Sequence, residues 1–233
     1  MKAKAIPTFL TAAALGGALA ACGVSAQAAE SGWQEEFGVS KCKLQTSGRN
    51  GYFILEPGYQ LVLDGNNTRL QVTVLDETRT IGGIATRIVE EREWKNGQLS
   101  EVAKNYFAIC ESTKDVFYFG EEVDYYKGGK VSGHDGSWLA EKGNRPGLMM
   151  AGAPRVKMRY YQEIAPGTAM DRAEIVSLTE TCETPAGTFT HCLKVEETSP
   201  LEPTVVEYKY YAPAIGLVAD GAARLVKHGS IIK

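Results

Sequence analysis

The chain has 233 residues, of which 44% are hydrophobic and 23% are charged, and its formal net charge at pH 7 is −3. This is ordinary globular composition, sufficient for one sizeable core or a single large β domain. The sequence contains no basic stripe, so nucleic acid and anionic lipid surfaces are poor partners on charge grounds.

Residues 1–21 have the anatomy of an export signal. Lys2 and Lys4 form a short positive region, and the apolar run "AIPTFLTAAALGGALAA" follows. Small residues dominate the run, and two Gly and one Pro interrupt it, which favours a cleaved signal over a permanent membrane helix. Cleavage would remove both lysines and leave a net charge of −5.

Two cleavage sites compete at the end of the signal. "LAAC", ending at Cys22, resembles the lipobox of bacterial lipoproteins, which implies diacylglycerol on Cys22 and attachment to a membrane through this lipid. "AQA" at 26–28 suits ordinary signal peptidase. The apolar run stops at Cys22, which favours the lipobox, and Gly23 resembles Gram-negative sorting signals for the outer membrane. We expect the periplasmic face of the outer membrane if Cys22 is lipidated, and otherwise a periplasmic or secreted protein.

Beyond a tether at 22–40, residues 41–233 predict a single β domain of short strands and regular turns. "YQLVLDG" ends at a turn, Asp64–Asn67, and "RLQVTVL" then alternates apolar and polar residues. "TRIVEEREW" leads into Asn96-Gly97, a strong hairpin dipeptide. Residues 115–126 are rich in aromatic and β-branched residues, 140–155 lack periodicity, and "TVVEYKYYA" alternates again.

These elements favour an all-β fold, a single antiparallel sheet curved into a half-barrel or barrel, with a long irregular loop near 140–155. A sandwich is the alternative. We found neither a linker that would split the domain nor a strict internal repeat.

Several runs resemble a family of exported bacterial proteins that has no assigned activity. They include "VFYFGEEVDYYKGGKV", "GSWLAEKGNRPGLMM" and "SPLEPTVVEYKYYAPAIGLV", and the resemblance covers about residues 50–220. More distantly, "PAGTF" and "YYAPAIGLV" are similar to the signature of LolA/LolB-like half-barrels. That resemblance implies a curved sheet whose concave face can hold acyl chains or hydrophobic peptides.

The sequence offers weak candidates for catalysis and metal binding. Ser132, His134 and Asp135 are the residue types of a hydrolytic triad, but a strand places Asp135 on the other face, and the chain has no G-x-S-x-G elbow. Glu122 and Asp124 would share a face, which permits a Ca²⁺ site or an acid–base pair but is more typical of a solvated sheet face. The three histidines lack metal-ligand spacing, and the methionines suit aromatic packing better than copper. We predict no catalytic residue, metal or cofactor.

Aromatic and methionine side chains are the candidates for a ligand pocket. Most would form the core, and some would line a cavity covered by the loop near 140–155. The pocket candidates are Phe117, Phe119, Tyr126, Trp138, Met149, Met150, Tyr160, Tyr208 and Tyr210.

Four cysteines follow Cys22, and export would place them in an oxidising compartment. The disulfide candidates are Cys42, Cys110, Cys182 and Cys192. In "CETPAGTFTHC", Pro185–Gly187 predicts a three-residue hairpin loop that pairs Cys182 with Thr190 and Cys192 with Glu180. The two cysteines would then be diagonal and too far apart for a disulfide, unless a bulge shifts the register. We therefore expect Cys110–Cys192 and Cys42–Cys182.

The sequence thus predicts an exported, lipid-anchored binding module of the cell envelope that is not an enzyme and holds a hydrophobic or lipid-like ligand. The alternatives are an envelope structural or interaction protein without a pocket, and a metal-dependent hydrolase.

Overall fold

The structure, a computed structural model, describes residues 32–231. The predicted export signal, the predicted lipid attachment site Cys22 and most of the predicted tether lie outside the described residues. Within them, the chain forms one large antiparallel sheet of 16 strands, which curves into a nearly closed barrel with an unsealed seam. The predicted all-β class and barrel shape are confirmed.

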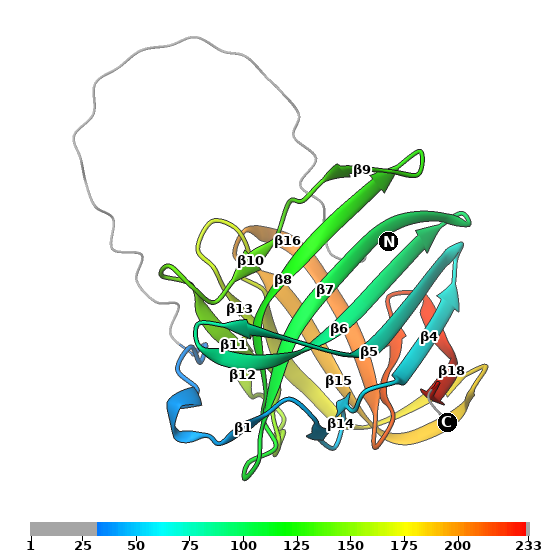
Figure 1. Cartoon of the computed structure of the whole chain (residues 1–233). Coiled ribbons are helices and arrows are strands. Elements are labelled where there is room, and N and C mark those ends of the chain that lie inside the picture. The colour runs from blue at the N-terminus through cyan, green and yellow to red at the C-terminus, as the bar shows by residue number, and fades with distance from the viewer. Residues whose placement is uncertain (1–31, 232–233) are drawn as a thin grey trace, which may run out of the picture.

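The long strands β5–β8 form one wall of the barrel, and β14–β16 form the wall across the interior from them (Figure 1). Along the sheet the order is β12 (Arg159–Tyr161), β14 (Arg172–Thr184), β15 (Gly187–Ser199), β16 (Glu202–Ala212), β17 (Gly216–Asp220), β18 (Ala223–Ser230), β4 (Tyr59–Gly65), β5 (Thr68–Ile81), β6 (Ile84–Lys95), β7 (Gln98–Cys110), β8 (Val116–Lys127), β11 (Arg145–Met150) and β13 (Glu163–Ile164).

Short elements complete the fold. β1 (Leu44–Gln45) pairs with β7, and both β9 (Lys130–Gly133) and β10 (Trp138–Leu139) pair with β8. The β8–β9 hairpin extends past the end of the barrel (Figure 1). A separate two-stranded sheet contains β2 (Gly48–Arg49) and β3 (Ile54–Leu55), and one 3₁₀ helix, η1, covers Val39–Lys41.

The predicted turns join the long strands as expected. Asn66 and Asn67 have φ values of 51° and 62°, and Asn96 and Gly97 have values of 52° and 76°. Two consecutive residues with positive φ match the right-handed twist of a hairpin, and Asn and Gly adopt this conformation at little cost. The first turn pairs β4 with β5 and the second pairs β6 with β7, while Gly82 and Gly83 form the turn between β5 and β6; these pairings fix the faces of β4 to β7.

The two ends of the sheet order, β12 and β13, meet at the unsealed seam, where the chain passes directly from one to the other. β12 pairs with β14 and β13 pairs with β11, yet only Gln162 separates β12 from β13. The crossing is tight, because a Cβ atom on Gly147 of β11 would lie 2.1 Å from the carbonyl oxygen of Gln162. Glycine is therefore required at position 147.

Residues 33–36 form a strap across the seam. Gln34 pairs in parallel with Tyr160 of β12, while Glu35 and Glu36 both form ion pairs with Arg145 of β11. The Trp33 ring lies under the Arg172 guanidinium, 4.4 Å from ring centroid to Cζ. Residues 33–36, within the segment 22–40 expected as a tether, therefore contact the barrel.

The segment 140–155 differs from the expected irregular loop, because its centre forms β11. Pro146 and Gly147 hide the strand pattern in "RPGLMM". Gly147 and Leu148 pair with β8, and Arg145 and Pro146 pair with β13, so tertiary contacts override the local sequence.

The expected disulfide pairing is wrong. Cys42 lies at disulfide distance from Cys110, with the two Cα atoms 5.3 Å apart, so neither Cys42–Cys182 nor Cys110–Cys192 forms. The reason is that η1 and β1 run along the end of β7, and β1 pairs Leu44 with Cys110.

The predicted register of the β14–β15 hairpin is also wrong near its turn. The loop contains two residues, Pro185 and Ala186, and Thr184 pairs with Gly187 rather than Thr188. Cys182 consequently pairs with Phe189. Cys192 faces Glu180 as predicted, because a bulge near His191, whose φ is 56°, restores the register.

Candidate functional site: two chambers inside the barrel

Most of the barrel interior is filled by side chains, but an inner chamber of about 110 Å³ remains. Its apolar wall comes from strands around the whole barrel and from the β2–β3 segment at one end, so the chamber lies within the lumen. The apolar lining comprises Phe53, Ile54, Leu61, Val72, Val74, Val89, Phe107, Met149, Ile215 and Leu217.

A buried ion pair separates this chamber from a second one. Lys209 Nζ on β16 lies 2.7 Å from Glu197 Oε2 on β15, with side-chain exposures of 16% and 10%. Gln162 Nε2, from the closure between β12 and β13, donates to Glu197 Oε1 at 2.9 Å. Burial opposes the charged amine, but Glu197 and Asp220 hold the pKa of Lys209 well above its ordinary value. The charged form of Lys209 is thus favoured, and the pair links Gln162 at the closure to β15 and β16.

The outer chamber has a volume of about 320 Å³ and a strongly acidic lining. It shares Lys209 and Glu197 with the inner chamber, together with Glu163 and Asp171, so the two spaces adjoin. Among residues 32–231, Lys209 is the one basic residue of its lining, against the acidic residues Glu121, Glu163, Asp171, Glu197, Glu202 and Glu207. Burial and the neighbouring Asp220, Glu197 and Asp171 raise the pKa of Glu207 to about 7, although Lys209 opposes the shift.

A polar pair also faces the inner chamber. The Tyr118 hydroxyl donates to Asn105 Oδ1 at 2.5 Å, and Asn105 Nδ2 donates to the carbonyl of Val89 at 3.3 Å. The Tyr118 ring stacks on Phe107 with centroids 4.7 Å apart. These contacts fix the aromatic wall in one conformation, so the chamber is preformed rather than made by side-chain rearrangement.

The structure places the sequence-predicted pocket residues in three environments. Met149 lines the inner chamber, and Phe119 borders a surface depression near Cys42. Tyr126, Tyr208 and Tyr210 are partly or well exposed. The remaining members are buried in the core: Phe117, Trp138, Met150 and Tyr160.

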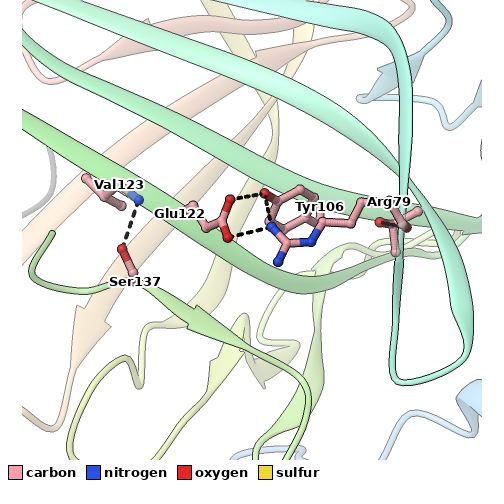
Figure 2. A network of polar contacts seen from close by, with 6 residues as sticks. Arg79, Tyr106, Glu122, Val123 and Ser137 are labelled. Atoms are coloured by element: carbon pink, nitrogen blue, oxygen red, sulfur yellow. Dashed lines mark hydrogen bonds and ion pairs between the residues drawn. The ribbon is translucent and has the colours of Figure 1, made fainter.

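Glu122, one of the acidic residues on β8, braces β8 against β5 and β7. Figure 2 shows Arg79 of β5 joined to Tyr106 of β7 and Glu122 of β8, with Arg79 Nη1 2.5 Å from Glu122 Oε1 and the Tyr106 hydroxyl donating to Glu122 Oε2 at 2.7 Å. The hydrogen bond from Arg79 lowers the pKa of Glu122, while burial and Glu122 raise that of Tyr106 to about 12. In the same view, the Val123 N–H donates to Ser137 Oγ at 2.9 Å.

The residues of a hypothetical triad have other partners. Ser132 Oγ donates to the carbonyl of Tyr125 at 3.2 Å, whereas His134 Nδ1 lies 2.8 Å from Asp124 Oδ1. Residues 32–231 contain no group of three or more His, Cys, Asp or Glu side chains placed to hold a metal ion. Within the same residues, no helix is long and apolar enough to cross a membrane.

Sequence reasoning missed the charged lumen residues. Glu207 and Lys209 alternate with Val206, Tyr208 and Tyr210 on β16, and the tyrosines were expected to face the pocket. A period-two pattern separates two faces but does not say which of them turns inward. The spacing of Glu207, Lys209 and Tyr211 could have identified these residues, because it places all three side chains on one face of the strand.

Comparisons of the chain with protein-family models, with curated proteins and with solved structures gave no significant match. The functional argument therefore depends on the chambers and their chemistry.

Proposed function

We propose that this protein is a non-catalytic binding module that holds a small hydrophobic or lipid-like ligand inside its barrel. The observation that carries the proposal is the apolar inner chamber, which adjoins a polar outer chamber across the Lys209–Glu197 pair. An amphipathic ligand matches this arrangement, with its apolar end in the inner chamber and its polar end in the outer one.

The size of the inner chamber limits the ligand. A cavity of roughly 150 Å³ accommodates benzene, so the 110 Å³ chamber suits a short alkyl segment or one small aromatic group. A longer tail would extend through the outer chamber and past Lys209. The acidic outer lining disfavours an anionic head group, because like charges repel strongly in a poorly solvated site. We therefore propose a neutral or cationic amphiphile.

We also propose that the module is exported and anchored through lipid on Cys22, at the periplasmic face of the outer membrane. The n-region, the apolar run and the "LAAC" sequence support export and anchoring. The Cys42–Cys110 pair supports an oxidising compartment, since structural disulfides are rare in reducing ones.

Binding can be tested with hydrophobic probes and a variant that fills the chamber. Purified protein should bind the neutral fluorophore N-phenyl-1-naphthylamine, with its phenyl ring in the inner chamber and its naphthyl group extending into the outer one. Dodecylamine should displace it more effectively than dodecanoate. Val74 is 4% exposed and lines the inner chamber, so Val74→Phe should weaken fluorophore binding at least tenfold. Val131→Phe is the matched control, because Val131 is 47% exposed on β9 and should leave binding unchanged.

Folding of the Val74→Phe variant should be checked by circular dichroism and urea unfolding. Equal binding by a folded Val74→Phe variant and the wild type would refute the inner chamber as the site. Stronger displacement by dodecanoate than by dodecylamine would refute the proposed ligand charge. An envelope interaction protein without a ligand would bind no probe at all.

A further inference from the structure

The β14–β15 hairpin brings two buried cysteines to the same face. Cys182 is 7% exposed and Cys192 is fully buried. Cys182 pairs with Phe189, so without a bulge Cys192 would point to the opposite face of the hairpin. The bulge near His191 inserts one residue and turns Cys192 back to the face that carries Cys182.

The bulge places the Cys192 thiol beside the residue that pairs with Cys182. Cys192 Sγ lies 3.5 Å from the carbonyl oxygen of Phe189, the residue paired with Cys182. Burial and a hydrogen bond with the Cys182 thiol raise the pKa of Cys192 to about 12. The pair therefore combines proximity with low reactivity at neutral pH, because the thiolate is the reactive form.

We propose that Cys182 and Cys192 form a second disulfide when the protein meets a disulfide oxidant, whether a small molecule or another protein. The bulge keeps both cysteines on one face of the hairpin, with the Cys192 thiol beside the residue that pairs with Cys182. This inference is independent of the proposed ligand binding.

The exchange proceeds in two balanced steps. Cys182, the more exposed residue, loses its proton, and its thiolate attacks one sulfur of the oxidant, which gives a mixed disulfide and releases one oxidant thiolate. Cys192 then loses its proton and attacks the Cys182 sulfur, which expels the second oxidant thiolate. Both cysteines are oxidised, and the oxidant is reduced to two thiols that take up the released protons.

The bond would lock a contact between the hairpin and the segment that covers one end of the lumen. The Tyr52 hydroxyl donates to the carbonyl oxygen of His191 at 3.1 Å. Phe53 and Ile54, which follow Tyr52, line the inner chamber. Oxidation at the bulge would thus stiffen the support of that chamber without altering its lining.

Peptide mapping of the wild-type chain tests the proposal directly. The protein is reduced, exposed to oxidised glutathione, blocked with N-ethylmaleimide in denaturant and digested with trypsin without reductant. Residues 173–194 contain no internal Lys or Arg, so one tryptic peptide carries both cysteines. It should be lighter by two hydrogens than the reduced peptide and carry no maleimide. Cys42–Cys110 is recorded separately, as a link between peptides 42–43 and 105–114.

Two maleimides on peptide 173–194, in protein whose Cys42–Cys110 bond has formed, would overturn the proposal. A link from 173–194 to peptide 42–43 or 105–114 would overturn it as well. In Cys192→Ser, glutathione should remain on Cys182 as a stable adduct, whereas Cys182→Ser should acquire much less. Ring closure should accelerate about tenfold per pH unit between pH 7 and 9, as the thiolate fraction rises.

Discussion

Lys209→Met tests whether the lumen holds a buried, ionised pair. Methionine keeps most of the length of the side chain but removes the amine, so Glu197 loses its cationic partner at 2.7 Å, while the hydrogen bond from Gln162 remains. Because both side chains are at least four-fifths buried, the change leaves a carboxylate with little access to water. Breaking such a pair costs about 3–5 kcal/mol.

Urea unfolding gives the measurement. With a denaturant slope near 3 kcal/mol per molar, the midpoint should fall by about 1–2 M. The deficit should shrink as the pH falls, because Glu197 then takes up a proton. Adding Glu197→Gln should recover part of the loss, since the double variant contains no unpaired carboxylate at this position.

The control is Lys43→Met, which breaks an ion pair with Glu111 whose side chains are 74% and 52% exposed. It should leave the midpoint unchanged, because solvent-exposed pairs contribute little. If Lys209→Met also left the midpoint unchanged, water in the two chambers would solvate the Lys209–Glu197 pair. That result would refute the inference that the pair is shielded from water.

Three further predictions concern pH, the disulfide and the barrel closure. The folded-state pKa of Glu207 is raised to about 7, so its stabilising contribution is complete below pH 4.5 and is lost as the pH rises through 7. Glu207→Gln should therefore gain stability relative to wild type as the pH rises across this window. A difference in the free energy of unfolding that stays constant with pH would contradict this. Replacing Cys42 and Cys110 by Ser should lower the free energy of unfolding by about 4 kcal/mol, as expected for a disulfide that spans 68 residues. A urea midpoint that is unchanged under oxidising conditions would show that the bond does not form. Gly147→Ala should destabilise the barrel by roughly 1–3 kcal/mol, because the added Cβ meets the backbone of the closure. The control, Gly133→Ala, should be tolerated, because its Cβ has no neighbour closer than 3.9 Å. Equal melting temperatures for the two variants would argue against the tight crossing.

The strand pattern was predictable where local chemistry determines it. Leu70 and Val74 are buried, as their alternation predicts, and Asn96-Gly97 forms the expected turn. The closure was not predictable, because β11 and β13 are short and their pairing depends on contacts across the barrel. The Cys42–Cys110 pair likewise depends on where β1 lies against β7, which no local pattern encodes.

The inward orientation of β16 bears on why the lumen is charged. Tyr208 is 40% exposed, and its hydroxyl donates to Glu196 on the outer face, while Lys209 points inward to Glu197. A barrel selected for stability alone would bury the tyrosines and leave the charges in water, because buried ion pairs are often less stabilising than apolar residues of equal volume. Natural proteins depart from such rules mainly at functional sites. The inverted polarity of β16 therefore favours a lumen that recognises a ligand over one that only completes the core.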